Sequence, residues 1–198
     1  MALVMALVLL LVCTVIAISA SSRSLLQQRM TNGLHQARTA HMFAETALRG
    51  AEWSLWAETA DPTSSLHCGN GALSTSCYRY DPDDPVYASN GAVTQFRHSP
   101  EWIDAGSREY RGPRGTIDYS ALPHNGSAAK NPVFIIEDLG VELPPGVEGG
   151  PAESGASGAG RSGYGSYSRH IYRVTARAVG NNENIVRVLE STYAAKSN

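Results

Sequence analysis

The first twenty residues, Met1 to Ala20, contain no charged residue, no proline and no glycine. At about 1.5 Å per helical residue, such a run spans roughly the 30 Å hydrocarbon core of a bilayer. A cleaved secretory signal, a lipoprotein signal and a retained membrane helix are the three alternatives. No basic residue precedes the run, and Cys13 follows Val12 rather than a small residue. We therefore predict a retained transmembrane helix over residues 1–20.

Residues 21–58 extend this helix, because they contain no proline and carry apolar residues in alternating steps of four and three. Asn32-Gly33 is the weakest point and favours a kink or local melting, and Asp61-Pro62 ends the helix. We expect Trp53 and Trp56 to pack in the core. The predicted packing face consists of Leu26, Met30, Leu34, Ala37, His41, Ala44, Leu48, Ala51 and Leu55.

The rest of the chain, residues 59–198, is expected to form a globular head. Residues 62–131 are dense in turn formers and indicate connections with short strands. A buried strand is predicted within residues 132–143, and a hairpin is predicted from residues 171–177 and 185–193 around Gly180-Asn181-Asn182. Between them, the Gly/Ser-rich residues 144–168 are typical of a flexible loop. These elements predict an α+β fold in which the helix packs on a C-terminal antiparallel β-sheet.

Three cysteines divide unevenly along the chain. Cys68 and Cys77 lie in a polar region and can close a short loop, which in an oxidising compartment stabilises the fold by roughly 2 to 3 kcal/mol. Two free thiols are the alternative, and a zinc site would lack further ligands. Cys13 lies in the apolar run and is interpreted as a small apolar side chain.

No catalytic or cofactor-binding constellation stands out. The six histidines are scattered without metal-ligand spacing, and His41 on the helical stripe is interpreted as a packed histidine. Asp81 to Asp84 lack the spacing of a calcium loop and are expected to form a solvated turn. A formal net charge of -2 does not indicate nucleic-acid binding. We predict no enzyme activity, no cofactor and no metal.

Several segments together resemble a known family. Residues 1–10, the segment Ala44-Glu45-Thr46-Ala47-Leu48-Arg49-Gly50-Ala51-Glu52, and the endings at residues 172–177 and 191–193 resemble PilX-type minor pilins of type IV pili. That family is related to the GspK-like tip pseudopilins of secretion systems. The resemblance implies a type IV pilin-like fold and a processed, N-methylated Met1.

The resemblance also implies partners and a location. The expected partners are other minor pilins, the major pilin, the inner-membrane assembly platform and, during maturation, prepilin peptidase. We expect a single-pass inner-membrane protein with a periplasmic head that reaches the pilus tip after assembly. Most pilins have Glu at position five, where it can pair with the N-terminal amine of a neighbour. Here the residue is Met5, and we interpret it as the marker of a tip subunit, which has no neighbour above it.

Three other functions compete with a priming complex at the pilus tip. A type II secretion tip pseudopilin would share the helix but usually carries a larger inserted domain. A pilus-associated adhesin would use residues 62–168 for contact, with the helix as an anchor. A single-pass membrane enzyme is opposed by the missing catalytic motif.

Overall fold

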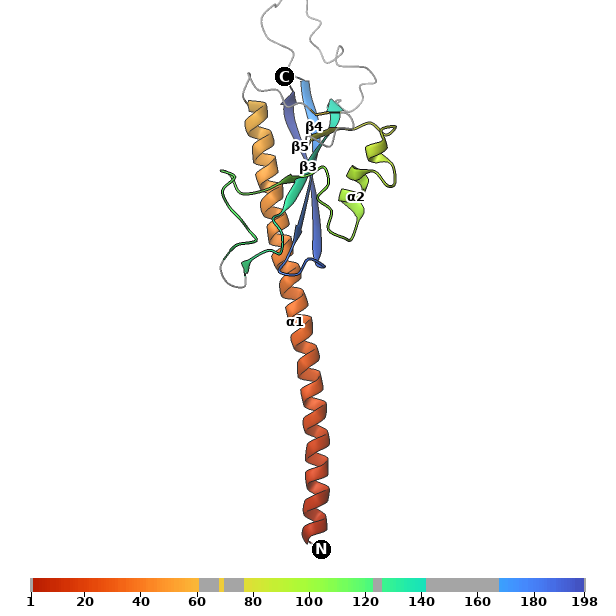
Figure 1. The fold of residues 1–198 in the computed structure, drawn as a ribbon, viewed down its shortest axis with the longest axis vertical. Helices are drawn as coiled ribbons and strands as arrows, with labels where there is room; N and C mark the ends of the chain where they lie inside the picture. The colour runs from red at the N-terminus through yellow and green to blue at the C-terminus, as the bar shows by residue number, and fades with distance from the viewer. Residues whose placement is uncertain (1, 61–67, 70–76, 123–125, 142–167, 198) are drawn as a thin grey trace, which may run out of the picture.

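The structure is a computed structural model that describes residues 2–60, 68–69, 77–122, 126–141 and 168–197. Helix α1, Ala2–Ala60, is by far the longest element. The strands and a short helix gather around its C-terminal half, while its N-terminal half extends away from them alone (Figure 1). The chain thus forms a head carried on a long stalk.

Helix α1 runs for 59 residues without a break. The helix continues through Asn32-Gly33, so the kink or local melting expected there does not occur. A glycine inside a helix costs about 1 kcal/mol relative to alanine, which a helix of this length tolerates. The helix ends at Ala60, directly before Asp61-Pro62, because the residue before a proline disfavours helical geometry. This end was predicted correctly.

One sheet forms the centre of the head. Its strands follow the order β1-β3-β4-β5, and β2 pairs with the same edge of β3 as β1 does. The bounds of the strands are β1 Cys77–Arg79, β2 Arg108–Glu109, β3 Val133–Val141, β4 Ser168–Val179 and β5 Val186–Ser197.

The predicted C-terminal hairpin and the predicted strand before it are confirmed. Strands β4 and β5 pair antiparallel over twelve positions, and β3 pairs antiparallel with β4. The predicted α+β fold with a C-terminal antiparallel sheet is confirmed, and the short strand β1 joins this sheet by pairing parallel with β3, an arrangement that was not predicted. Parallel pairing requires a long crossover connection, and the chain between these two strands provides one. The loop predicted at residues 144–168 lies, except for Ser168, outside the described residues.

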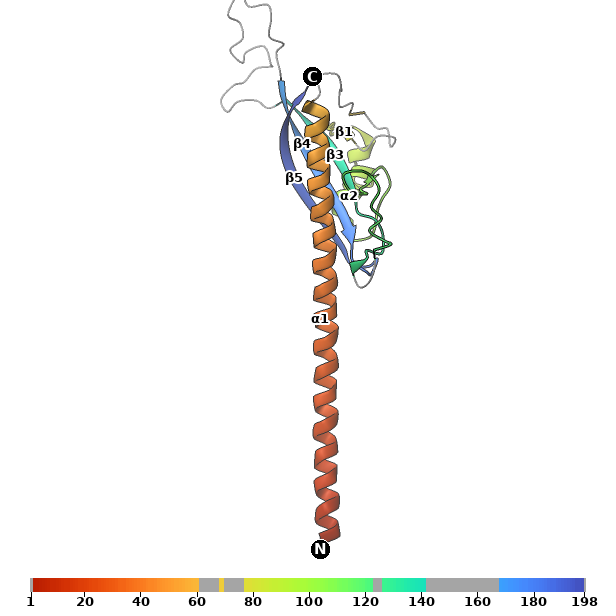
Figure 2. The ribbon, with the colours of Figure 1, turned by 90° about the vertical axis from the view of Figure 1, so that its left-hand side faces the viewer.

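The C-terminal half of α1 packs on one face of the sheet (Figure 2). Ala44, Ala47 and Ala51 are fully buried, and their small side chains allow the helix to lie close to the strands. Leu48 and Leu55 fill the space between the alanines. The sheet contributes the alternate residues that point to this face, namely Phe134, Ile136, Tyr172, Val174, Ala176 and Ala195.

Helix α1 contacts the loop after β2 at Gly50, a position that we call the glycine notch. A side chain at Gly50 would have its Cβ only 2.1 Å from Cε2 of Tyr110. The bare helix backbone therefore makes room for the Tyr110 ring. This ring stacks on Tyr119, with 6.1 Å between ring centroids, and Tyr119 in turn meets Phe43 of α1 edge-on. Gly50 lets this aromatic row pack against the helix.

A second layer covers the other face of the sheet. It contains the 3₁₀ turn η1, Pro85–Tyr87, and helix α2, Ala92–His98. Val93 and Phe96 of α2 are buried against Tyr78, Val133 and Ile135. Helix α2 was not expected from the sequence, because its seven residues are too few to show a helical period and the segment lies among prolines and glycines.

Arg177 of β4 connects this layer to the sheet. The side chain is fully buried. Its guanidinium donates hydrogen bonds to the backbone carbonyls of Phe96 at 2.5 Å and Ser99 at 2.8 Å, and also to that of Glu101. These carbonyls belong to the end of α2 and to the turn after it, where backbone carbonyl groups have no hydrogen-bond partner within the helix. Burial lowers the pKa of Arg177 to about 10, so the group stays charged at neutral pH.

Glu137 of β3 is a buried carboxylate on the same face. It is 0% exposed, and neither carboxylate oxygen has a hydrogen-bond partner. The Nε atoms of Arg97 and Arg173 each lie 3.8 Å away. Burial raises the pKa of Glu137 above its ordinary value of 4.5, although the two arginines oppose this shift. The ionised form of Glu137 is therefore costly in the folded state.

The Gly50→Ala substitution should lower the stability of the head by about 1 to 2 kcal/mol, because the new methyl group displaces Tyr110. Gly33→Ala is the matched control, since nothing lies within 4 Å of its Cβ position. It should raise helix stability by up to about 1 kcal/mol. Thermal unfolding of the full chain in detergent measures both effects. Equal stabilisation by the two substitutions would contradict the role of the notch.

The Glu137→Gln substitution should change the pH dependence of stability. A raised folded pKa means that the contribution of Glu137 is present below its unfolded pKa and is lost as the pH rises through the folded pKa. The amide of glutamine does not ionise, so the variant does not lose stability in this way. It should therefore gain stability relative to the wild type as the pH rises from 4 to 8. Unfolding curves across that range measure the gain. A difference that is independent of pH, or falls as the pH rises, would contradict this account.

Candidate assembly surface

The N-terminal half of α1 is exposed, and its first part, residues 2–20, is apolar. Every described residue from Ala2 to His35 is exposed, including large side chains such as Leu3, Leu7 and Ile18 at 61% to 77%. The most apolar 18-residue window has a mean hydropathy of 3.0 and no buried residue. By length and composition this helix can cross a membrane. An apolar helix of this kind suits anchoring in a membrane.

Polar side chains on this helix bond back to its own backbone. The Thr14 hydroxyl donates to the carbonyl of Leu11 at 2.8 Å, and the Ser22 hydroxyl donates to that of Ile18 at 2.9 Å. Each donor is thereby satisfied without water. The hydroxyl groups of Thr14 and Ser22 are therefore compatible with an apolar surrounding.

Three residues that the sequence singled out lie in this half of the helix. Met5 is 73% exposed, and Cys13 is an exposed free thiol. Met1 lies outside the described residues. The division into a transmembrane part, residues 1–20, and an amphipathic part, residues 21–58, stays a prediction, because the helix passes through both without a break.

The predicted packing face splits into two parts. Ala44, Leu48, Ala51 and Leu55 are buried against the sheet, whereas Leu26, Met30 and Leu34 are 55% to 69% exposed. The reason is the length of the head. The tip of the β4–β5 hairpin meets α1 at Gln36, where a Cβ on Gly180 would lie 2.7 Å from the backbone carbonyl oxygen. Before that point the helix has no sheet beside it.

Three predictions about individual residues on α1 are wrong. His41 is exposed rather than packed, and Trp53 and Trp56 are each 55% exposed rather than buried in the core. The buried face instead continues through Ala40 and Ala47, which sequence reasoning missed. The pattern of alanines at steps of three and four was the available signal, because small residues permit the closest helix packing.

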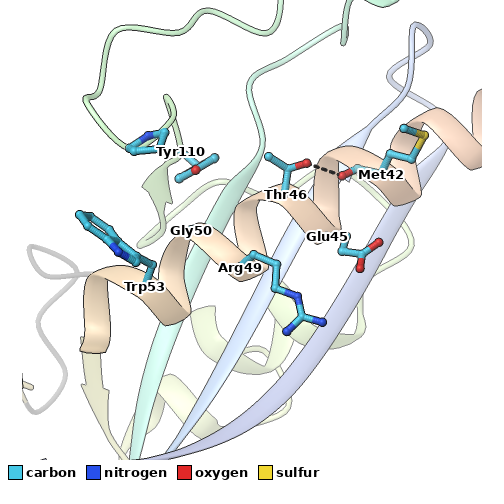
Figure 3. Close-up of a pocket in the computed structure, with 8 residues that line it drawn as sticks. Met42, Glu45, Thr46, Arg49, Gly50, Trp53 and Tyr110 are labelled. Atoms are coloured by element: carbon cyan, nitrogen blue, oxygen red, sulfur yellow. Dashed lines mark hydrogen bonds between the residues drawn. The ribbon is translucent and has the colours of Figure 1, made fainter. Parts of the chain in front are cut away.

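A shallow pocket lies on the flank of α1 beside the glycine notch (Figure 3). Its volume is about 520 Å³. Met42, Trp53 and Tyr110 supply apolar surface, and Arg49 forms an ion pair with Glu52 at 3.3 Å at the exposed side of the helix.

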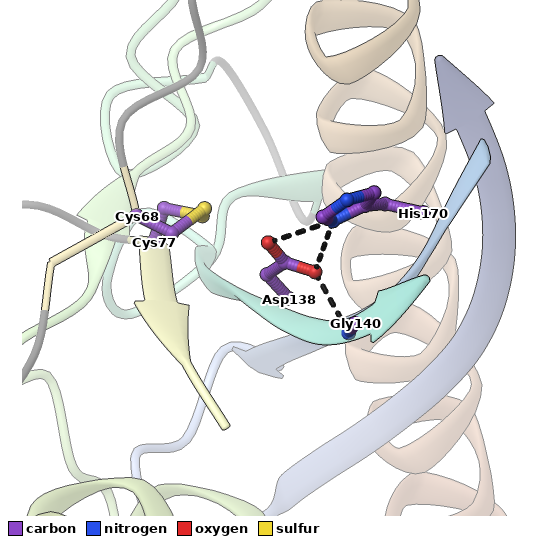
Figure 4. Close-up of a disulfide and its surroundings, with 5 residues drawn as sticks. All are labelled: Cys68, Cys77, Asp138, Gly140 and His170. Carbon is purple, nitrogen blue, oxygen red and sulfur yellow. Dashed lines mark hydrogen bonds and ion pairs between the residues drawn. A yellow bond between two sulfur atoms is a disulfide. The ribbon is translucent and has the colours of Figure 1, made fainter. Parts of the chain in front are cut away.

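The predicted disulfide between Cys68 and Cys77 is present (Figure 4). It ties the segment that follows α1 to the first residue of β1, next to a parallel bridge between Gly69 and Tyr78. The loop residues 70–76 between the two cysteines lie outside the described residues. The bond holds the short edge strand β1 in place against β3.

A contact between a histidine and an aspartate lies close to the disulfide, toward the end of β3 and the start of β4 (Figure 4). Nδ1 of His170 lies 3.0 Å from Oδ1 of Asp138, and the same oxygen accepts a hydrogen bond from the backbone N–H of Gly140. Gly140 has a φ of 97°, which glycine adopts without strain. The sequence could not reveal this pair, because its members are 32 residues apart and only the β3–β4 register joins them.

The described residues contain no group of three or more metal-ligating side chains. Of the six histidines, His35, His41 and His98 are exposed and separate, and His67 and His124 lie outside the described part. The surface that the structure offers is therefore the exposed N-terminal half of α1, apolar over residues 2–20, with the pocket beside Gly50 above it.

Comparisons with known proteins agree with this arrangement. The family model for the C-terminal region of the type IV pilus assembly protein PilX matches residues 31–195, and the PilX N-terminal model matches residues 1–49. No curated protein and no solved structure matches significantly. The two models together cover both the helix and the head. The chain belongs to the PilX family and is a minor pilin of the type IV pilus.

Proposed function

We propose that this minor pilin belongs to a complex at the pilus tip that primes filament assembly and performs no catalysis. The observation that carries the proposal is the exposed, uncharged first part of α1, residues 2–20, with Met5 in place of an acidic residue. This surface must be covered, because apolar area in water costs roughly 25 cal/mol per Å². Lipid covers it before assembly, and the helices of other pilins cover it afterwards.

Met5 favours the tip over the shaft. In the shaft of a filament, an acidic residue at position five gains a partner from the N-terminal amine of a neighbouring subunit. A subunit at the tip has no neighbour above it, and an unpaired carboxylate buried among apolar helices costs several kcal/mol. The thioether of Met5 has no such cost and packs adaptably among helices.

The mechanism is one of ordered association. The apolar half of α1 joins laterally with other minor pilins in the inner membrane, their periplasmic heads dock, and the complex then accepts the major pilin from the assembly platform. Prepilin peptidase acts earlier and leaves Met1 as the first, N-methylated residue. The finished filament carries the head at its tip on the cell surface.

Deleting the gene should abolish surface pili, and a plasmid copy of the wild-type gene should restore them, because the primer starts each filament. Electron microscopy counts the filaments, and a secretion assay and an adhesion assay run beside it. Normal pilus numbers in the deletion strain would contradict priming. In that case, failed secretion would indicate a secretion pseudopilin, and lost adhesion would indicate an adhesin.

The same strain tests the role of Met5. A plasmid that carries Met5→Glu should restore clearly fewer pili than the wild-type plasmid, because the tip leaves the carboxylate unpaired. Met5→Leu is the matched control and should restore normal numbers, since it keeps an apolar side chain of similar volume. Membrane levels of both variants must equal those of the wild type. Full restoration by Met5→Glu would contradict the tip assignment.

A further inference from the structure

The two edges of the sheet differ in how they are closed. On one side, the edge of β3 is covered by two short strands, β1 of three residues and β2 of two residues. On the other side, β5 is the last strand, and all twelve of its residues pair with β4 without a register shift. Among the described residues no strand pairs with its outer edge. Figure 2 shows β5 lying beside α1 at the margin of the sheet.

This open edge carries main-chain groups that need partners. In an antiparallel ladder alternate residues direct their N–H and C=O groups away from the paired strand, so about six residues of β5 present them outward. Proteins usually protect such an edge by prolines, bulges, very short strands or charged side chains. Strand β5 has neither proline nor glycine, contains no bulge and is long, and its charged residues, Arg187, Glu190 and Lys196, leave residues 191–195 uncharged. It has the form of a template for one more strand.

The side chains beside the edge define what an added strand would meet. On the face that carries α1, Leu189 and Tyr193 are partly buried against the core, and Ser191 donates a hydrogen bond to Oε1 of Glu52 at 2.7 Å. On the opposite face, Glu190 is held by Arg97 at 3.0 Å. Arg187 is exposed near the start of the strand. An added strand would therefore place apolar residues toward α1 and an acidic residue near Arg187.

The direction of β5 argues against antiparallel pairing with β5 of a second copy. The β4–β5 turn lies beside the middle of α1, so β5 runs away from the membrane end (Figure 1). Antiparallel pairing of β5 with β5 of a second copy requires a two-fold axis perpendicular to the sheet. Such an axis would point the two apolar helices in opposite directions. Both helices could not then enter one membrane.

We propose that the outer edge of β5 binds an extended segment of a different protein, which adds to the sheet as an antiparallel strand. Main-chain hydrogen bonds supply the affinity, and the alternating side chains described above select the partner. This inference rests on the proposed function, because it names one contact through which the primer joins its complex.

Neighbouring proline substitutions test the edge. Of the adjacent residues Ser191 and Thr192, one directs its N–H to β4 and the other directs its N–H outward. Proline at the inward residue should unfold the head, whereas proline at the outward residue should leave it folded. The folded proline variant should restore at least several-fold fewer pili in the deletion strain. Alanine at the same residue is the matched control, keeps the N–H and should restore wild-type numbers.

Hydrogen exchange of the wild-type chain provides a second measurement that needs no variant. The outward amides of β5 should exchange at least tenfold more slowly in the tip complex purified from piliated cells than in the purified chain in detergent. Unchanged exchange, full piliation by the folded proline variant, or protection of β5 by a second copy alone would each overturn the proposal. If the deletion strain itself keeps its pili, the proposed function fails. If the deletion strain loses its pili and the folded proline variant restores them as well as the wild-type gene does, this inference alone fails.

Discussion

The face of α1 that carries Ala44, Ala47 and Ala51 lies against β4 and β5, and the rest of the head is placed by this contact. Each alanine side chain is a single methyl group, so the helix can approach the sheet closely. Leu48 and Leu55 complete the layer. On the opposite face of the sheet, the buried Arg177 of β4 donates hydrogen bonds to the end of α2. The β4–β5 hairpin thus supports both layers of the head.

The hairpin also determines where the head stops along α1. Below Gln36 the helix has no strand beside it, its surface is exposed down to the described N-terminus, and over residues 2–20 this surface is free of charged residues. This asymmetry separates two tasks on one helix, because the upper half stabilises the subunit and the lower half remains available to lipid and to other subunits. The unpaired edge of β5 adds a second open surface, on the head itself.

Much of this architecture could be predicted from the sequence. The helix end at Asp61-Pro62, the C-terminal hairpin and the Cys68–Cys77 bond follow from local residue chemistry, and the structure confirms them. The burial of individual helix residues could not be derived in the same way. Periodicity predicts which residues share a face, but Leu34 is exposed because the sheet lies beside α1 only from Gln36 onward. His41 is exposed because the buried face runs through Ala40 and Ala44 instead. Helix α2, the Glu137 site and the Asp138–His170 pair depend on contacts between distant segments.

The central claim is that this subunit occupies the tip of the filament. Gold labelling of an epitope tag at the C-terminus of the chain, on pili sheared from complemented deletion cells, tests it most directly. Labelled filaments should carry gold at one end only. Gold distributed along the shaft, or filaments that form normally without any label, would contradict a tip position.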